Sequence, residues 1–200
     1  MNFAVISTEI FILCLGLFAI VMDLVLPAKE SHKSIGAVLI FALTGWFLYM
    51  FTLYQGPLNP MEPEAMTVIA DKFFYQGMYF VDNYALFFKQ IFILATVFTM
   101  LFASDYVQSV LRYKGEFYAL LLMALLGMCV LASATDFLTM FIGLELMTIS
   151  FYILTGARMS SKDSSEAAVK YLIIGSVSTA TMLYGISLVY GATGSIQFFE

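Results

Sequence analysis

The sequence predicts an all-α polytopic membrane protein with six transmembrane helices in its 200 residues. Hydrophobic residues make up 62% of the chain and charged residues only 12%, whereas soluble domains carry about a quarter charged residues. The chain also contains six apolar runs of about 20 residues each, the length that a helix needs to cross a bilayer. Because backbone groups cannot stay unpaired in hydrocarbon, and the runs are too long for barrel strands, we expect helices.

The apolar runs are separated by five connections that differ in length and charge. The first, LPAKESHKS, is short and basic, and the second, at about 55–83, is long and begins with the proline-rich PLNPMEP. The third is YVQSVLRYKGE, the fourth is a very tight turn around Thr135 and Asp136, and the fifth is RMSSKDSSEA. The predicted spans are 5–26, 35–54, 84–104, 116–135, 137–157 and 167–191. We therefore divide the chain into an N-terminal three-helix segment, 1–110, with a long outward loop, and a second part, 111–200.

The positions of the basic residues predict the orientation of the spans. The first, third and fifth connections contain six of them: Lys29, Lys33, Arg112, Lys114, Arg158 and Lys162. The second and fourth connections offer only Lys72. Short basic loops stay on the cytoplasmic side, so we expect the N-terminus and the long second connection to face outward. The start, MNFAVISTEIF, has no basic region and is not expected to be a cleaved signal peptide.

Four charged residues lie near the ends of predicted spans. We expect Asp23 and Asp105, close to the cytoplasmic boundary, to be solvated or interfacial. Glu9 lies one to two turns into the first span, and its position fits an interfacial residue as well as one that contacts a partner. Lys89 begins the third span, where its side chain could either extend to the interface or form a local ion pair.

Glu145 is the charged residue that position does not explain, because it stands in the middle of the uncharged run FIGLELMTIS. Nine residues separate it from Asp136 and thirteen from Arg158. A charge at the centre of a lone membrane helix costs about 2.5–3.5 kcal/mol on insertion scales. Thr148 and Tyr152 follow on the same helix face, where they are candidates for lining a polar path. We interpret Glu145 as a proton-handling group, with a static buried ion pair as the alternative.

Lys170 is the second candidate, and it opens the sixth predicted span. Ile174, Ser178 and Thr181 continue its helix face, and the two hydroxyl residues are candidates for lining the same path. The alternative is that Lys170, which lies about one turn beyond Glu166, only extends its side chain to the membrane interface. At a rise of 1.5 Å per residue, Lys170 lies roughly 10 Å or more from the midplane. We therefore do not expect it to pair directly with Glu145, and no other base in the six spans fits well.

Other chemistries find little support in the sequence. Cys14 and Cys129 stand in apolar runs without a CxxC motif or a neighbouring His, so we expect small buried hydrophobic residues. One His and two isolated Cys cannot ligate haem or an iron–sulfur cluster. The chain has no Gly-rich nucleotide loop and no nucleophile elbow, and we expect no metal site and no nucleic-acid partner.

The motifs GLEL and EAAVKYLIIG, at this spacing, resemble the N subunits of proton-pumping NADH:quinone oxidoreductase (respiratory complex I). The resemblance covers nearly the whole chain and is most specific at 115–195, and the segment FVDNYALFFKQIFILATVFTMLFASDYV is similar to the family's third span. It implies the N-terminal part of an antiporter-like fold with two inverted five-helix repeats, the first starting within 111–200. It also implies that Glu145 and Lys170 match the family's proton-translocating glutamate and lysine, and that a seventh-span lysine is the missing partner of Glu145.

The resemblance implies an enzyme subunit that takes part in redox-driven proton translocation but carries no cofactor itself. NADH, FMN, the iron–sulfur clusters and quinone would belong to other subunits. Its partners would be the other membrane-arm subunits, sister antiporter-like subunits among them, and the lipid of an energy-transducing membrane, in bacteria the inner membrane. Two alternatives remain: a subunit of a multi-subunit sodium/proton antiporter or membrane-bound hydrogenase, and a purely structural membrane scaffold in which Glu145 is dispensable.

Overall fold

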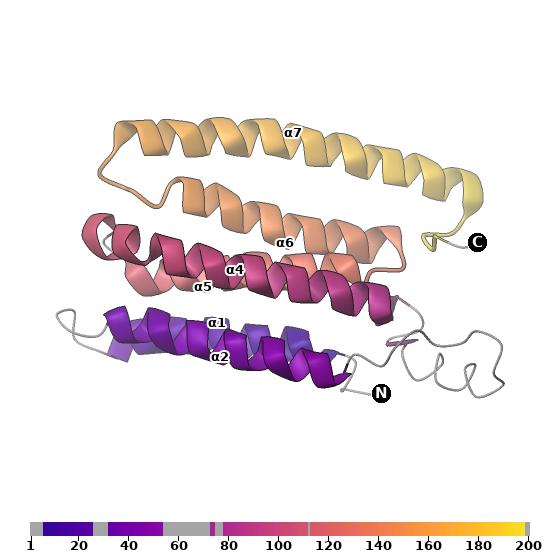
Figure 1. The fold of residues 1–200 in the computed structure, drawn as a ribbon. Helices are drawn as coiled ribbons and strands as arrows, with labels where there is room; N and C mark the ends of the chain where they lie inside the picture. Colours follow the sequence, from indigo (N-terminus) through magenta and orange to yellow (C-terminus); the bar gives the residue numbers. More distant parts are fainter. Residues whose placement is uncertain (1–5, 26–31, 54–72, 75–77, 112, 199–200) are drawn as a thin grey trace.

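The fold is a stack of long helices that run roughly parallel or antiparallel to one another (Figure 1). The computed structural model describes all residues except 1–5, 26–31, 54–72, 75–77, 112 and 199–200. The helices are α1 (Ser7–Val25), α2 (His32–Leu53), α4 (Asn83–Val110), α5 (Lys114–Ala132), α6 (Phe137–Thr155) and α7 (Lys162–Thr193). Two short antiparallel strands, β1 (Phe73–Phe74) and β2 (Tyr79–Phe80), lie within the long second connection.

Five of these helices, α1, α4, α5, α6 and α7, are long and apolar enough to cross a membrane. This confirms the helical membrane class. In α2 the described apolar part, Ile35–Met50, is shorter, so the sixth span stays a prediction. Most of the predicted outward loop lies outside the described residues, but its end forms the β1–β2 pair, which the sequence analysis did not anticipate.

Two helices are longer than their apolar runs because polar residues extend them. Asp82 caps the start of α4, its carboxylate accepting from the Ala85 N–H at 2.7 Å, and α4 continues past Asp105 to Val110. Ser161 caps α7, which therefore begins five residues before the predicted span. Apolar length predicted the inner part of each helix, whereas N-caps decide where the helix begins.

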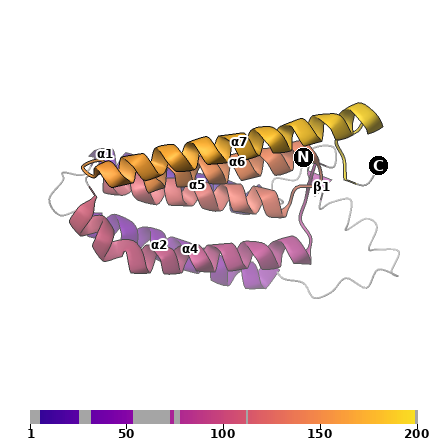
Figure 2. The same ribbon diagram turned by 90° about the horizontal axis from the view of Figure 1, so that it is seen from above.

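The apolar core lies between α1, α2, α4 and α5. Its fully buried side chains come from all four helices: Ile12, Leu39, Leu43, Ile93, Met100, Leu122 and Leu125. In Figure 2, α2 and α4 form one pair and α5, α6 and α7 lie beside them. α5 contacts α1, α2, α4 and α6, and α7 packs on α6. No residue of α7 is fully buried, so this helix has the least covered surface among the described helices.

One end of the bundle brings three separate segments of the chain together. We call it the hairpin end: it contains β1–β2, the α5–α6 turn (133–136) and the C-terminal segment (195–198). Gly194 ends α7 with φ 74°, a left-handed conformation that glycine adopts without strain. The turn that follows lets the chain return to the α5–α6 turn, where Asp136 pairs with Gln197 in a β-bridge.

Candidate functional site

The helix that carries Glu145 is positioned by its first residue and by a close contact with α5. Asp136 is fully buried and caps α6, accepting from the backbone N–H of Thr139 at 2.8 Å and from its hydroxyl at 2.6 Å. Farther along, a Cβ on Gly127 of α5 would lie only 2.6 Å from the Gly143 carbonyl oxygen and from the Met147 backbone nitrogen. The two backbones are therefore in direct contact on either side of Glu145.

Glu145 is half-buried near the middle of α6. It lies about 12 Å from the start of the helix and about 15 Å from its end, at 1.5 Å per residue. Its Oε1 is buried and has no hydrogen-bond partner among the residues that the structure describes. Ile142 and Ile149, one turn away on either side, are exposed. The carboxyl group thus stands at the edge of an apolar helix face that no described element covers.

Thr148 and Tyr152 share that part of α6, but neither contacts the Glu145 side chain through a described hydrogen bond. The Thr148 hydroxyl donates to the Glu145 backbone carbonyl at 3.2 Å. Tyr152 is buried against α7, where its hydroxyl fills the space that a side chain at Gly175 would occupy. Its ring meets Tyr171 edge to face at 4.8 Å between centroids. Tyr152 therefore holds α6 and α7 together.

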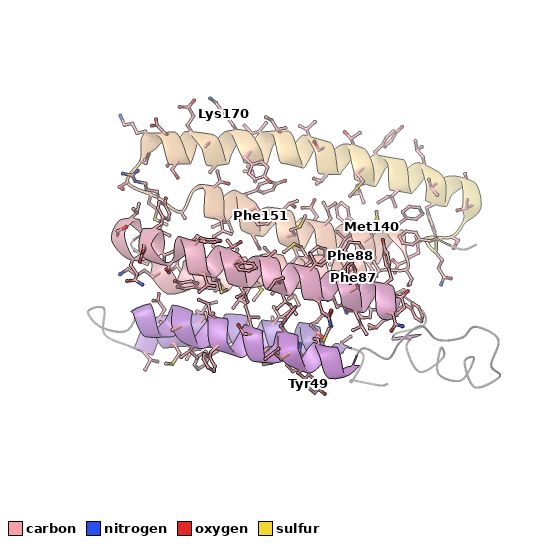
Figure 3. All side chains as sticks on the ribbon, in the orientation of Figure 1. Tyr49, Phe87, Phe88, Met140, Phe151 and Lys170 are labelled. Atoms are coloured by element: carbon pink, nitrogen blue, oxygen red, sulfur yellow. The ribbon has the colours of Figure 1, made fainter. Side chains whose placement is uncertain are left out.

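Lys170 lies on the exposed side of α7, away from α6 (Figure 3). Its side chain is 69% exposed and forms an ion pair with Glu166, one turn earlier. Ser178 and Thr181 are exposed as well, and their hydroxyls donate to the carbonyls of Ile174 and Val177 in the same helix. The described part of the chain thus leaves this polar stripe uncovered and does not bring Lys170 to Glu145.

A second charged cluster, which sequence reasoning had only half identified, lies at the hairpin end. Lys89 Nζ is 2.8 Å from Glu9 Oε1 and 2.9 Å from the Tyr79 hydroxyl. The ion pair was one of the two alternatives for Lys89, and a partner contact was one of those for Glu9. Tyr79 was missed because it lies in the long connection. The sequence did contain a sign of this contact, because Glu9 and Lys89 carry opposite charges and lie at similar distances from the outward ends of their predicted spans.

The remaining charged and sulfur-containing residues differ in how well they were predicted. Asp105 is exposed, as expected, but Asp23 packs closely against Gly115 of α5. Cys129 is buried, whereas Cys14 is exposed. The prediction of a buried residue was wrong for Cys14, because this side chain of α1 points away from the apolar core between the helices. No cluster of three or more His, Cys, Asp or Glu side chains that could hold a metal ion occurs among the described residues.

Fold and site together define a helical membrane protein that keeps a half-buried carboxyl group in the middle of one apolar helix. A family model described as NADH:quinone oxidoreductase/Mrp antiporter, TM, matches residues 134–200. The NADH-quinone oxidoreductase subunit N of Desulfitobacterium hafniense is 43% identical over 98% of this chain and 37% of its own length. That of Heliobacterium modesticaldum is 40% identical over 98% of this chain and 38% of its own length.

Solved structures of respiratory complexes contain chains with a similar fold. A chain of respiratory complex I from Thermus thermophilus matches with a TM-score of 0.70 and 26% identity, over 97% of this chain and 39% of that chain. A chain of the membrane-bound sulfane sulfur reductase, an archaeal respiratory membrane complex, matches with a TM-score of 0.69 at 20% identity, and so shares the fold. The chain is similar over nearly its whole length to NADH-quinone oxidoreductase N subunits, and it spans less than two fifths of the length of these relatives.

Proposed function

We propose that this chain forms part of a membrane-arm subunit of NADH:quinone oxidoreductase that takes part in redox-driven proton translocation. Glu145 is the group that gains and loses the proton. The names of the relatives support the complex, since the similarity extends over nearly the whole chain. The enzyme is then a translocase in which NADH, FMN, iron–sulfur clusters and quinone are bound by other subunits.

The observation that carries this proposal is the buried Glu145 Oε1, which has no hydrogen-bond partner in the described part of the chain. A carboxylate away from water is costly unless it is paired, and a structural acid would have its partner in place. A group that exchanges protons instead needs a partner whose charge or distance can change. The uncovered face around Glu145 is where such a base would approach.

That base comes from outside the described helices, and a lysine of a further span of the subunit is our candidate. Lys170, Ser178 and Thr181 then line the route by which protons reach Glu145 from the basic side. Thr148 and Tyr152 complete the lining on α6. Each of these side chains carries a proton or a hydroxyl group that can hold water, which is what a proton route through an apolar bundle requires.

Several further features of the assembly are part of this proposal. The N-terminus and the hairpin end face outward, because the basic connections lie at the other end, and the membrane is the bacterial inner membrane. Residues 111–200 begin the first antiporter-like repeat, which the family match at 134–200 supports, and residues 1–110 form the N-terminal three-helix segment. Other membrane-arm subunits, including sister antiporter-like subunits, are the partners.

A second candidate function is that of a subunit in a multi-subunit sodium/proton antiporter or membrane-bound hydrogenase. The description of the matching family model supports this function, because it names Mrp antiporters together with NADH:quinone oxidoreductase. Both functions use the same proton-handling acid. NADH-dependent quinone reduction by the purified complex distinguishes them, since only the first function requires that the chain copurify with this activity.

The test replaces Glu145 in the full-length subunit within the assembled complex. Glu145→Gln keeps the shape of the side chain but cannot exchange a proton, and Glu145→Asp keeps the proton while shortening the reach. Glu116→Gln, the same change at an exposed carboxylate in the first turn of α5, is the matched control. Proton pumping and quinone reduction are measured in membrane vesicles, and subunit content is checked by immunoblot.

We expect Glu145→Gln to assemble normally but to pump fewer protons and to reduce quinone more slowly. Glu145→Asp should retain some of both activities, and Glu116→Gln should equal the parent. The loss is partial if sister antiporter-like subunits pump in parallel. Full pumping by assembled Glu145→Gln complex would refute the proposal and leave Glu145 as a structural residue.

A further inference from the structure

The Glu9–Lys89 ion pair is buried as deeply as the apolar core. Lys89 is 1% exposed and Glu9 is 7% exposed. The lysine nitrogen also lies 5.1 Å from the centre of the Tyr79 ring, within the range of a cation–π contact. Lys89 thus joins α1, α4 and β2 through one charged group. Removing a single partner from such a pair leaves a buried charge uncompensated, which is strongly unfavourable.

Tyr79 takes part in this cluster as a neutral hydrogen-bonding group. Burial, above all, raises the pKa of its hydroxyl, and the nearby Glu9 carboxylate raises it further. The hydroxyl oxygen therefore keeps its proton while it accepts the hydrogen bond from Lys89. This contact helps to hold β2 in place, since the strand is only two residues long.

The strand that contains Tyr79 is bonded through its backbone to the turn that precedes α6. Tyr79 forms a β-bridge with Ala134. On either side of it, the Phe80 N–H donates to the Ser133 carbonyl at 2.9 Å and the Thr135 N–H donates to the Met78 carbonyl at 3.3 Å. The turn ends at Asp136, the N-cap of α6.

The C-terminal segment holds the same turn from its other side. The Phe137 N–H donates to the Ile196 carbonyl at 3.0 Å, and the Phe198 N–H donates to the Thr135 carbonyl at 3.2 Å. The start of α6 is therefore fixed by β2 on one side and by the chain after α7 on the other. Because Tyr79 of β2 contacts Lys89 of α4, which pairs with Glu9 of α1, β2 ties the start of α6 to α4 and α1.

We propose that Glu9, Lys89 and Tyr79 are positioning residues for Glu145: through β2 they fix the start of α6, and with it the place of the carboxyl group in the membrane. Glu145 lies nine residues along the helix from Asp136, about 14 Å at 1.5 Å per residue. A helix this short moves as a rigid rod, so a displacement at its capped end is carried to Glu145. This inference rests on the proposed role of Glu145 in proton transfer.

The test uses the full-length subunit in the assembled complex and measures proton pumping per NADH oxidised. Tyr79→Phe removes only the hydroxyl that Lys89 contacts. Glu9→Gln/Lys89→Met removes both charges together, so that neither is left unpaired. Lys89→Arg keeps the charge and the donors. Thr96→Val is the matched control on α4, since Thr96 is buried but its hydroxyl donates only to the Phe92 carbonyl of its own helix.

We expect Tyr79→Phe and the neutral double variant each to lower pumping severalfold, Lys89→Arg to retain most of it, and Thr96→Val to equal the parent. An ion pair that merely neutralises two buried charges predicts instead that the neutral double variant pumps normally. Tyr79→Phe is the mildest of these changes and keeps the test decisive even where the double variant does not assemble.

The decisive comparison places Tyr79→Phe in a Glu145→Gln background. If the cluster acts by positioning Glu145, the second change causes no further loss of pumping, because residues that act through one another are not additive. Independent, multiplying losses would overturn the inference while leaving the role of Glu145 intact. Full pumping by Glu145→Gln alone would refute the proposed function itself, and the positioning role with it, so the two failures are distinguishable.

Discussion

Gly127 offers a way to displace α6 without touching any charged group. A methyl group at this position would lie 2.6 Å from the Gly143 carbonyl oxygen and 3.1 Å from the Met147 Cα. Both are backbone atoms, which cannot rotate away as a side chain can. Ordinary van der Waals contact begins near 3.4 Å, so Gly127→Ala must separate α5 and α6 locally by about 0.8 Å, the gap between these two distances. Glu145 lies between the two contact points and moves with them.

The expected cost has a structural and a functional part. Overpacking of this kind destabilises proteins by about 1–3 kcal/mol, and the better helix propensity of alanine returns up to about 1 kcal/mol. A net loss of up to about 2 kcal/mol should lower the thermal inactivation temperature of the purified complex. Misplacing a reacting group by about 1 Å can cost up to a hundredfold in rate. The loss of proton pumping should therefore be larger than the lower stability of the complex alone would cause.

The matched control is Gly45→Ala, at a glycine of α2 where an added methyl group meets no atom within 4 Å. It makes the same chemical change with the same gain in helix propensity. Thermal inactivation and proton pumping are measured for both variants in assembled complex. If Gly127→Ala matches Gly45→Ala in both assays, α5 and α6 do not approach as closely as described and the reasoning fails.

Three further predictions concern the N-cap of α6, the charge of Lys170 and the orientation of the helices. Asp136→Ala should destabilise the complex by about 0.5–2 kcal/mol through the lost N-cap of α6, with Asp136→Asn closer to the parent; equal thermal inactivation of both variants would contradict the capping role. Lys170→Ala should lower proton pumping and Lys170→Arg should retain it, because the positive charge is what the position supplies; unchanged pumping by Lys170→Ala would leave it as an interfacial lysine. Finally, a membrane-impermeant thiol reagent added to intact cells should label a cysteine at Ser195 but not one at Met159, and the opposite pattern would reverse the proposed orientation.

The sequence predicted the helical membrane class well because apolar length is a local property. Each described helix overlaps its predicted run, and the very tight turn around Asp136 is where it was expected. The same local reasoning identified Glu145 as an acid that neither end of its helix can reach. The structure places it half-buried, with one oxygen that lacks a hydrogen-bond partner among the described side chains and backbone. Properties that depend on one helix alone could therefore be predicted.

What the sequence could not predict depends on contacts between distant segments. The link from Lys89 to Tyr79 joins a helix to a two-residue strand, and nothing in the composition of the long connection indicated a strand there. The contact of Gly127 with Gly143 depends on which faces of α5 and α6 meet, and neither helix is amphipathic enough to show it. The exposed side chain of Lys170 likewise depends on how α7 is rotated against α6, which helix periodicity does not determine.

The most direct test of the central claim asks whether Glu145 changes its protonation state during turnover. Redox-induced infrared difference spectra of the assembled complex detect the C=O stretch of a carboxyl group that gains or loses a proton. We predict a carboxyl band in the parent complex that disappears in Glu145→Gln, shifts in Glu145→Asp and persists in Glu116→Gln. Carboxyl bands identical in parent and assembled Glu145→Gln complex would show that Glu145 keeps one protonation state, and would contradict the account.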